Sequence, residues 1–414
     1  MRIFIWHGYL LAGTGSNVYT RQLVREWANA GHAVTVFSQD PDPSRFDLGG
    51  ATTVRPDAGS LLPVFVLDGY AGHTVKLLQD CTEAELEAWV EANAAAVRGR
   101  GPADLVFANH VLLGGPVGAA SGFRYVVKAH GSELEYSMRG NEELSRWGGE
   151  ALAGAAATIA GSEHIRAVVA EVCGMVDGVH VIPPGVDVDV WRPQPRAEAL
   201  ESLVAEARRD QRNPGSGNER LPDEGNADRL AAFLAADRPT IVSYGKLIRN
   251  KGVQVLLEAL RGIDARCVVV GFGDYRAELE EQARGLDVLF TGPLEHRHLV
   301  HLLALADVSA VPSIFPEAFG MVAAESAAAG CPPVVADHSG LAEVADGLEA
   351  EYPPALRGLV RFPTGDADAL HERLAGILAL GRADREAIRA ASRRAAVERW
   401  SWSSVATRIL VAAG

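Results

Sequence analysis

Two glutamates near the three-quarter point of the chain could contact one ligand. Residues 312–336 read PSIFPEAFGMVAAESAAAGCPPVVA, with Glu317 and Glu325 at the two ends of a short apolar run. A helix is expected over residues 321–329, because Gly330 and the two prolines that follow cannot continue it. Glu317 then precedes the helix and Glu325 lies about one turn inside it, so the two cannot share a proton as a catalytic dyad does.

The amides at the start of this helix form a candidate phosphate site. They follow a strand expected over residues 308–311, and a helix N-terminus after a parallel strand favours anions. The two glutamates would then contact the two ends of an elongated ligand whose phosphate lies at the amides. The alternative is a pair of solvated surface glutamates, which is the usual state of this residue type.

Two lysines follow another expected strand of the same half of the chain. Residues 243–260 read SYGKLIRNKGVQVLLEAL, which places Lys246 and Lys251 after the strand and before the next helix. Their ammonium groups could bind a pyrophosphate and neutralise the charge of a departing phosphate. A solvated loop that happens to contain two lysines is the alternative.

Glycine-rich turns follow two of the expected strands. Gly13 and Gly15 lie in the first strand-to-helix turn, where backbone can approach a ligand closely. As a dinucleotide fingerprint this turn fails, because Val18 stands where the third glycine belongs. The later pair, Gly271 and Gly273, also lacks the third glycine, so both turns are weak evidence for a nucleotide.

A single histidine stands at a strand end in the first half. His130 directly follows a strand expected over residues 124–128 and should lie at the ligand-binding edge of the sheet. A packed loop histidine is the alternative. The neighbouring Glu133 and Glu135 are expected to be exposed to solvent or to an acceptor.

Metal-binding patterns are weak in this sequence. His298 and His301 are about one helical turn apart, but no cysteine or paired aspartate accompanies them. The pairs Asp40-Pro-Asp42 and Asp187-Val-Asp189 fit a short pattern of metal-dependent sugar transferases, yet a three-residue match arises readily by chance. No metal site is expected.

Composition limits the classes of partner. The 414 residues carry a net charge of −14 with a pI of about 5.4, which disfavours nucleic acid and strong attraction to anionic lipid. The start of the chain shows neither a basic segment nor a cleavage site, and no run has the length of a membrane helix. The four cysteines are widely separated, which favours a reducing cytoplasm and no disulfide framework.

The order of the expected elements indicates two domains. Short apolar strands alternate with amphipathic helices over residues 2–182 and again over residues 240–336, typical of doubly wound parallel sheets. We expect a first Rossmann-like domain at 1–194, a flexible segment at 195–238, a second such domain at 239–385, and helices at 386–414 that cross back to the first domain.

Taken together, these segments resemble the retaining glycosyltransferases of family 4. Their Glu-x7-Glu motif is present as Glu317-AFGMVAA-Glu325, and their Gly-Arg-Leu…Lys-Gly motif as GKLIRNKG at residues 245–252. Further matches are GHAVTVF at 31–37, SEHIR at 162–166, VIPPGVDVDVWRP at 181–193 and SGLAEVADG at 339–347. The resemblance implies the GT-B fold, two facing Rossmann-like domains, with an acceptor-side domain at 1–194 and a nucleotide-sugar-binding domain at 239–385.

The resemblance also implies roles for individual residues. Glu317 would bind hydroxyls of the donor sugar, Glu325 would accept hydrogen bonds from the ribose, and Lys246 and Lys251 would bind the pyrophosphate. His130 would lie beside the reacting sugar. Gly15 would approach the distal phosphate, Gly292 and Leu294 would contact the base, and the remaining sugar and phosphate contacts would come from Ala318, Phe319, Gly320, Met321 and Val322.

The sequence departs from the family pattern at two of these positions. The glycine pair of the N-terminal loop is Thr14-Gly15 here, and the usual arginine of the phosphate site is Lys246. Lysine keeps the charge but loses the two-pronged hydrogen bonding of arginine.

The expected reaction is transfer of a hexose from a nucleotide-diphosphate sugar to an acceptor hydroxyl, with retention of configuration and without a metal or other cofactor. UDP and GDP are favoured over ADP, and the acceptor is a small molecule, a lipid-linked molecule or a glycan. The expected location is cytoplasmic, with at most peripheral membrane contact. A non-catalytic sugar-nucleotide-binding scaffold and an NAD-linked oxidoreductase are the alternatives.

Overall fold

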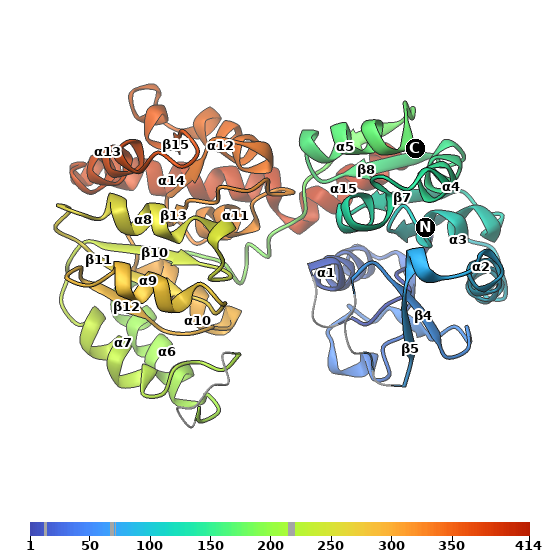
Figure 1. The fold of residues 1–414 in the computed structure, drawn as a ribbon, viewed down its shortest axis with the longest axis horizontal. Coiled ribbons are helices and arrows are strands. Elements are labelled where there is room, and N and C mark those ends of the chain that lie inside the picture. Colours follow the sequence, from blue (N-terminus) through green and yellow to red (C-terminus); the bar gives the residue numbers. More distant parts are fainter. Residues whose placement is uncertain (12–14, 67–69, 71, 214–219) are drawn as a thin grey trace. The chain divides into compact units, whose positions relative to one another are not determined.

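The chain forms two α/β domains. The structure is a computed structural model that describes residues 1–11, 15–66, 70, 72–213 and 220–414. It divides into two compact units: the N-terminal domain, Met1–Gly185 with Trp402–Gly414, and the C-terminal domain, Val186–Ser401. Each domain is built on a parallel sheet with helices on its faces (Figure 1), so the expected α/β, doubly wound fold class is confirmed.

The N-terminal domain has a seven-stranded sheet in the order β3-β2-β1-β6-β7-β8-β9, with a separate β4-β5 pair. Its strands are β1 (Arg2–Trp6), β2 (Ala33–Phe37), β3 (Thr52–Val54), β4 (Leu61–Val64), β5 (Thr74–Leu77), β6 (Leu105–Asn109), β7 (Tyr125–Ala129), β8 (Ala157–Ala160) and β9 (Val179–Val181). Its α-helices are α1 (Gly15–Asn29), α2 (Glu83–Arg98), α3 (Gly114–Ser121), α4 (Glu142–Ala153), α5 (Glu163–Cys173) and α15 (Trp402–Ala413). Short turns are η1 (Pro43–Arg45), η2 (Leu78–Asp80) and the π-helical η3 (Leu134–Met138).

The C-terminal domain has a six-stranded sheet in the order β12-β11-β10-β13-β14-β15. Its strands are β10 (Thr240–Tyr244), β11 (Arg266–Val270), β12 (Val288–Phe290), β13 (Val308–Val311), β14 (Pro333–Ala336) and β15 (Arg361–Phe362). Its α-helices are α6 (Arg196–Arg208), α7 (Asn226–Leu234), α8 (Val253–Ala259), α9 (Arg276–Gln282), α10 (His296–Leu305), α11 (Met321–Ala328), α12 (Ser339–Glu351), α13 (Ala367–Leu378) and α14 (Arg382–Trp400). The turns η4 (Arg249–Lys251) and η5 (Pro354–Leu359) complete it.

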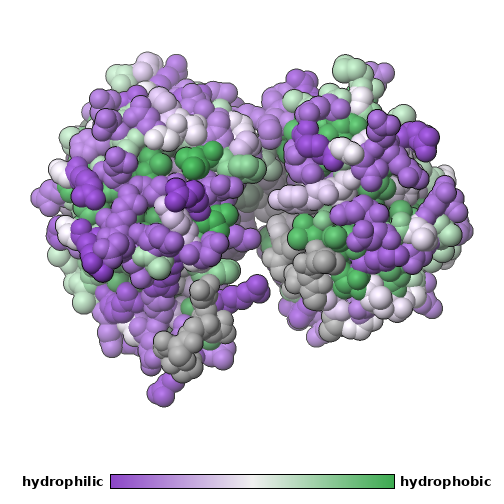
Figure 2. Space-filling view, in the orientation of Figure 1, coloured by the Kyte–Doolittle hydropathy of each residue, from purple (hydrophilic) through white to green (hydrophobic). Residues whose placement is uncertain are grey.

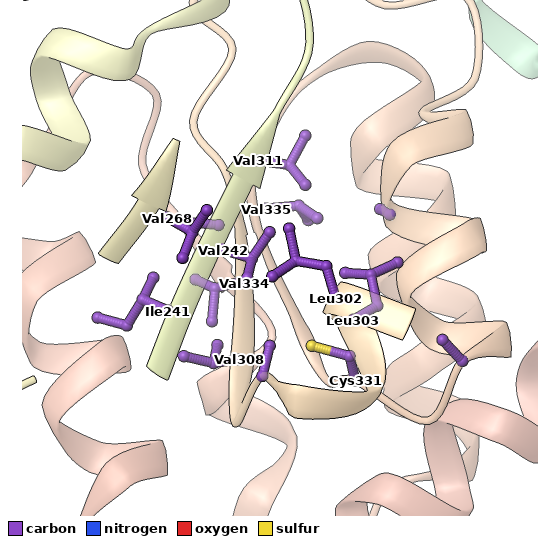
Figure 3. Packing of buried hydrophobic residues seen from close by; sticks show 14 of the residues in the cluster. Ile241, Val242, Val268, Leu302, Leu303, Val308, Val311, Cys331, Val334 and Val335 are labelled. Atoms are coloured by element: carbon purple, nitrogen blue, oxygen red, sulfur yellow. The ribbon is translucent and has the colours of Figure 1, made fainter. Parts of the chain in front are cut away.

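Burial on both faces of the sheets explains the strand sequences. Every residue of β11, β13 and β14 is buried, and these strands consist mainly of valine and alanine. Helices that cover both faces leave no solvent side on which polar residues could alternate. Figure 3 shows the resulting core, where Val242, Val308 and Val334 of three strands lie near Leu302 and Leu303 of α10. The core fixes the strand ends at which the candidate site lies.

The segment at 195–238, expected to be flexible, is largely helical. It contains α6 and α7, which bury Leu203 and Leu230 in the core of the C-terminal domain and pack against each other. The apolar residues of α6 recur at helical spacing, which buries one face of the helix. The prediction of flexibility was therefore wrong for these two helices, and residues 214–219 between them lie outside the described part of the chain.

The C-terminal helices divide between the two domains. Helix α14 belongs to the C-terminal domain, whereas α15 packs against α1 and β8 of the N-terminal domain, where Figure 1 shows it in red among blue and green elements. Trp402 and Ile409 are buried there, and the Trp27 indole N–H donates to the carbonyl of Ala406 at 3.2 Å. The N-terminal domain is therefore completed by residues from the end of the sequence.

The chain passes between the domains twice, at 185–186 and at 401–402. The two passages lie side by side, because the Val186 N–H donates to the carbonyl of Trp400 at 2.6 Å and Val186 pairs with Ser401 in a parallel bridge.

The face of each domain seen in Figure 2 is mostly polar. Figure 2 shows hydrophilic residues over most of the visible face of each domain, with hydrophobic residues in smaller groups between them. Among the described helices, none has both the length and the apolar composition to cross a membrane.

Candidate active site

The loop before α11 is held in one conformation by neighbouring backbone. The Glu317 N–H donates to the Ser339 hydroxyl at 2.8 Å, and the Gly340 N–H donates to the Glu317 carbonyl at 3.0 Å. A Cβ on Gly340 would lie 2.4 Å from the Phe319 Cα, so only glycine allows this packing. Gly320, the residue before α11, has φ 114°, and this positive angle favours glycine. The amides at the start of α11 are thus positioned before any ligand binds.

The structure brings Lys251 and Glu317 into contact. The Lys251 ammonium lies 2.5 Å from the Glu317 Oε1, and both side chains are partly exposed. Lys246 is exposed in the loop after β10, and no ion pair to it is found within the described residues. A ligand phosphate that binds the Lys251 ammonium has to compete with Glu317 for it. The ion pair compensates the charge of each side chain.

Glu325 is buried beneath the start of α11. Its side chain points toward Tyr244, whose hydroxyl lies 3.1 Å from the Glu325 Oε2 and 2.9 Å from the Val322 carbonyl. Burial raises the pKa of the Glu325 carboxyl to about 7. Hydroxyl groups of a ligand would stabilise the ionised carboxylate, because hydrogen bonds to the charged form favour ionisation. Tyr244 was not identified from the sequence, since nothing in its local pattern marks its contact with Glu325.

The glycines of the C-terminal strand ends allow two loops to pack closely. A Cβ on Gly271 would lie 1.8 Å from the Gly245 carbonyl oxygen, and a Cβ on Gly273 would lie 2.3 Å from that of Leu247. A Cβ on Gly252 would meet the Pro312 carbonyl oxygen at 1.8 Å. These glycines therefore position the Lys246 and Lys251 loop, which accounts for the G-x-G at 271–273 without a dinucleotide.

The expected base-contacting loop, Gly292 to Leu294, lies against a segment that the sequence did not assign to the site. Gly292 has φ 68°, and a Cβ there would lie 2.7 Å from the Asp223 carboxylate. Asp223 receives two hydrogen bonds from Arg276, at 2.8 and 2.6 Å, and its N–H donates to the Thr291 carbonyl. The contact could not be expected from the sequence, because residues 195–238 showed no apolar period around Asp223.

In the N-terminal domain, His130 follows β7 as expected and is partly buried. Its Nε2 lies 2.8 Å from the Asn109 Oδ1, and its ring packs edge-on against Tyr19 with centroids 5.4 Å apart. Gly15 is exposed at the start of α1, and a Cβ added there would meet no atom within 4 Å. Gly13 and Thr14 lie outside the described residues, so the shape of that turn stays a prediction.

A row of imidazoles extends from His130 into the N-terminal domain. His110 stands 4.6 Å from His130 and 6.1 Å from His7, measured between ring centroids. Burial, with His110 close by, lowers the pKa of His7 to about 3 and that of His130 well below its usual value. Burial also lowers the pKa of Lys128 to about 7. His7 and His130 are therefore neutral at this edge.

Glu133 was expected to be exposed, and this was wrong. It is fully buried, where it accepts hydrogen bonds from the N–H of His130 at 2.8 Å and of Val111 at 3.3 Å, and pairs with His110 at 3.3 Å. Burial alone would raise the pKa of Glu133, but His110 and the backbone N–H of His130 lower it below its usual value. Glu133 thus connects the loops after β6 and β7. Glu135 is exposed, as expected, and pairs with Arg139.

The residues of the weak metal-binding patterns contact other groups of the protein. His298 is buried 3.0 Å from Asp210, and the His301 Nδ1 lies 2.7 Å from the Gln194 side chain. Asp40 is buried and accepts from the Leu11 N–H, while Asp187 accepts from the Asp189 N–H. Within the described ranges, no group of three or more histidine, cysteine or carboxylate side chains is arranged to hold a metal ion.

Similar proteins occur among curated relatives. One is the D-inositol 3-phosphate glycosyltransferase of Xylanimonas cellulosilytica, 33% identical over 245 residues, which are 57% of this chain and 51% of that protein. The match thus spans about half the length of that relative. Another is the GDP-mannose-dependent alpha-(1-6)-phosphatidylinositol monomannoside mannosyltransferase of Mycobacterium tuberculosis, 27% identical over 307 residues, which cover 70% of this chain and 69% of that protein.

Solved structures share the fold over nearly the whole chain. Sucrose-phosphate synthase from Thermosynechococcus elongatus has a TM-score of 0.67 at 22% identity and covers 99% of this chain and 97% of its own. Anabaena Alr3699/HepE in complex with UDP has a TM-score of 0.67 at 17% identity and covers 99% of both chains.

Two family models match, one mostly in each domain. The model for Glycosyltransferase Family 4 matches residues 13–190, and the model for Glycosyl transferases group 1 matches residues 227–394. Together they span most of the sequence, including most of the strand ends described above. The chain belongs to the glycosyltransferases of family 4, with the GT-B fold that its motifs predicted.

Proposed function

We propose that the protein transfers a hexosyl group from a nucleotide-diphosphate sugar to a hydroxyl of an acceptor, with retention of configuration. The observation that carries the proposal is the arrangement at the strand ends of the C-terminal domain. There Lys251 contacts Glu317, and Lys246, five residues earlier in the chain, is exposed. The loop whose amides lead into α11 is held by backbone hydrogen bonds. Cations and amides at one edge suit a diphosphate leaving group.

The roles of the side chains follow from their chemistry. Lys246, Lys251 and the amides of residues 318–322 stabilise the negative charge that develops on the diphosphate as the glycosidic bond breaks. Glu317 then exchanges part of its contact with Lys251 for hydroxyls of the sugar. Glu325 accepts hydrogen bonds from the ribose, and Gly292 and Leu294 contact the base. Gly15 and His130 serve the same reaction from the N-terminal domain.

Retention without a protein nucleophile is part of the proposal. Glu317 is engaged by Lys251, and Glu325 is buried beneath α11. We therefore assign neither carboxylate to attack on the sugar. Attack from the side of the departing diphosphate fits this arrangement, and the leaving group can take the proton of the acceptor hydroxyl.

The relatives suggest substrates to test first. Their names include an inositol phosphate and a phosphatidylinositol mannoside as acceptors, and GDP-mannose as sugar donor, whereas HepE binds UDP. We propose an inositol-type acceptor, free or lipid-linked, with a UDP or GDP sugar as donor. The reaction is proposed to need no metal ion.

Binding and transfer can be tested separately. A thermal-shift screen of UDP, GDP and ADP sugars should raise the melting temperature with one nucleotide class, because a ligand that binds only the folded state stabilises it. The selected sugar donor is then incubated with inositol, inositol phosphate and phosphatidylinositol, and the anomeric proton of the product is followed by NMR. Inversion would contradict retention, and failure of every nucleotide sugar to bind would overturn the proposal. Binding without turnover would support a scaffold.

A further inference from the structure

A chain of hydrogen bonds in the N-terminal domain fixes which nitrogen of His130 carries the proton. The Asn109 amide Nδ2 donates to the Trp6 carbonyl at 3.3 Å, and a carbonyl can only accept. The Asn109 Oδ1 therefore points the other way, toward the His130 Nε2 at 2.8 Å. Because an amide oxygen also only accepts, Nε2 must carry the hydrogen.

The other ring nitrogen of His130 is consequently a hydrogen-bond acceptor. Nδ1 of the neutral ring holds a lone pair, and no hydrogen bond to it is found in the part of the chain that the structure describes. The ring is held by Asn109 and by its edge-on contact with Tyr19.

The surroundings of His130 keep it neutral. Around the ring lie His110 at the end of β6, His7 at the end of β1, Lys128 of β7 and the phenol of Tyr19 on α1. Glu133, a carboxylate buried in the same group, accepts from the His130 backbone N–H and pairs with His110. Burial and the neighbouring His110 and Lys128 lower the pKa of His130 well below its usual value.

We propose that Asn109 is a positioning residue that presents the His130 Nδ1 as a hydrogen-bond acceptor to a hydroxyl of the donor sugar. The inference rests on the proposed function and adds the direction of this hydrogen bond and the residue that sets it. A phosphate oxygen without a proton cannot be the partner of Nδ1, because two acceptors do not bond. A sugar hydroxyl can, since it carries a proton to donate.

The tautomer can be measured without any substrate. Two-bond ¹H–¹⁵N spectra of the labelled wild-type protein, with His130→Gln used for assignment, should show Nδ1 unprotonated and Nε2 protonated between pH 6 and 8. A protonated Nδ1 in this range would overturn the proposal. This readout stays informative even if no nucleotide sugar proves to be a substrate, so it separates a failure here from a failure of the proposed function.

Kinetics of two Asn109 variants test the role in turnover. Asn109→Ala should lower kcat by about tenfold, the value of one neutral hydrogen bond. Asn109→Asp places a carboxylate beside His130, which should raise the pH at which activity is lost on acidification by about one unit or more. The sign follows because protonation of Nδ1 removes the acceptor, and a nearby negative charge favours protonation.

A matched control is available in the same domain. Asn93 is also fully buried, where it accepts from the Trp6 indole N–H at 3.1 Å and donates to the Trp89 carbonyl at 2.8 Å. Asn93→Ala should destabilise the domain by a comparable amount, yet leave the pH profile of kcat unchanged. Equal effects of the two alanine variants on kcat, or an unshifted profile for Asn109→Asp, would reduce Asn109 to a structural residue.

Sugar donors that each lack one hydroxyl identify the partner of Nδ1. The donor without that hydroxyl should lose about tenfold in kcat with the wild type and nothing further with Asn109→Ala, because both changes remove the same hydrogen bond. Additive losses for every deoxy donor would contradict the proposal.

Discussion

The two domains place different chemistry at equivalent edges of similar sheets. In the C-terminal domain the strand ends carry exposed or partly exposed charges, Lys246, Lys251 and Glu317, on loops packed tightly through glycines. In the N-terminal domain the strand ends carry buried or partly buried imidazoles, of which His7 and His130 are kept neutral. One edge carries groups that can bind an anion, whereas the other offers the uncharged imidazoles of His7 and His130.

The buried carboxylates of the two edges make the same contrast. Glu325 has a tyrosine hydroxyl as its side-chain partner, and burial raises its pKa to about 7. Glu133 is equally buried, yet backbone N–H groups and His110 keep its pKa below the usual value. Glu133 thus receives hydrogen bonds from its own domain that favour its ionised form, whereas Glu325 has fewer such partners and can accept further hydrogen bonds from a ligand. The contrast teaches that burial alone does not identify the ligand-binding acid.

The largest effect should come from breaking the anion site. Lys251→Ala should lower turnover by roughly 10²–10³, the scale of losing one group that stabilises transition-state charge. Arg249→Ala is the matched control, because Arg249 is a cation of the same turn that stacks over Tyr275 at 4.9 Å. Steady-state kinetics should show only a small change for the control. Near-normal turnover of Lys251→Ala would remove this edge from the reaction.

Removing the charge of Glu325 should weaken nucleotide binding. Glu325→Gln should cost roughly 1.5–3 kcal/mol in calorimetric affinity for the nucleoside diphosphate, the value of hydrogen bonds to a charged group. Glu349→Gln, a change to a carboxylate of α12 paired with Arg361, should leave the affinity unchanged. Unaltered affinity of Glu325→Gln would end the ribose assignment.

The same site gives a pH dependence of known sign. Because the pKa of Glu325 is about 7 and the ribose favours its ionised form, wild-type affinity should rise by about tenfold from pH 6 to pH 8. Glu325→Gln should bind with an affinity that hardly changes over this range. A wild-type affinity that falls with rising pH would contradict the assignment.

Stability measurements sharpen the comparison of the two acids. The pKa of Glu325 is about 7 in the folded protein, which is above the value of the unfolded chain. The free energy of unfolding of the wild type should therefore fall as the pH rises from the unfolded pKa through 7. Glu325→Gln should therefore be more stable than the wild type at pH 8, by up to about 3 kcal/mol. Glu133→Gln should instead be less stable by about 1.5–3 kcal/mol, because it loses hydrogen bonds to a charged acceptor.

Urea unfolding of the two variants at pH 5 and pH 8 checks this prediction. For Glu325→Gln the advantage should shrink toward pH 5, where the wild-type acid is already neutral. Stabilisation of both variants at pH 8 would show that the two acids do not differ as described.

The smallest effect is expected from removing metal ions. Treatment with a chelator should leave the transfer rate unchanged, since cationic side chains and amides are proposed to stabilise the leaving group. A large loss that is restored by one divalent cation would require a different account of the C-terminal edge.

The sequence predicted most strands because residues buried on both faces form short apolar runs, as in β11 and β14. It missed α3, GGPVGAAS, because glycine and proline disfavour helix. There, a Cβ on Gly118 would lie 2.7 Å from the Tyr125 ring, and one on Gly115 would lie 2.9 Å from the Ala151 Cβ. Close packing explains these glycines, and such packing is invisible in a single sequence.

The candidate site shows the same limit. Spacing along the chain indicated Lys251, Glu317 and Glu325, because each lies next to a helix start that follows a strand. Asn109 and Glu133 could not be identified in this way, because their roles depend on partners from other strand ends. Hydrogen bonds between distant loops leave no periodic pattern in the sequence.

The position of α15 has a consequence for biosynthesis. Because residues 402–413 belong to the N-terminal domain, the ribosome must translate the entire C-terminal domain before α15 can pack against α1. Until then the nascent chain lacks the helix that contacts Tyr19 through Trp402 and Trp27 through Ala406. The domain translated first therefore cannot be complete until residues 402–413 have been translated.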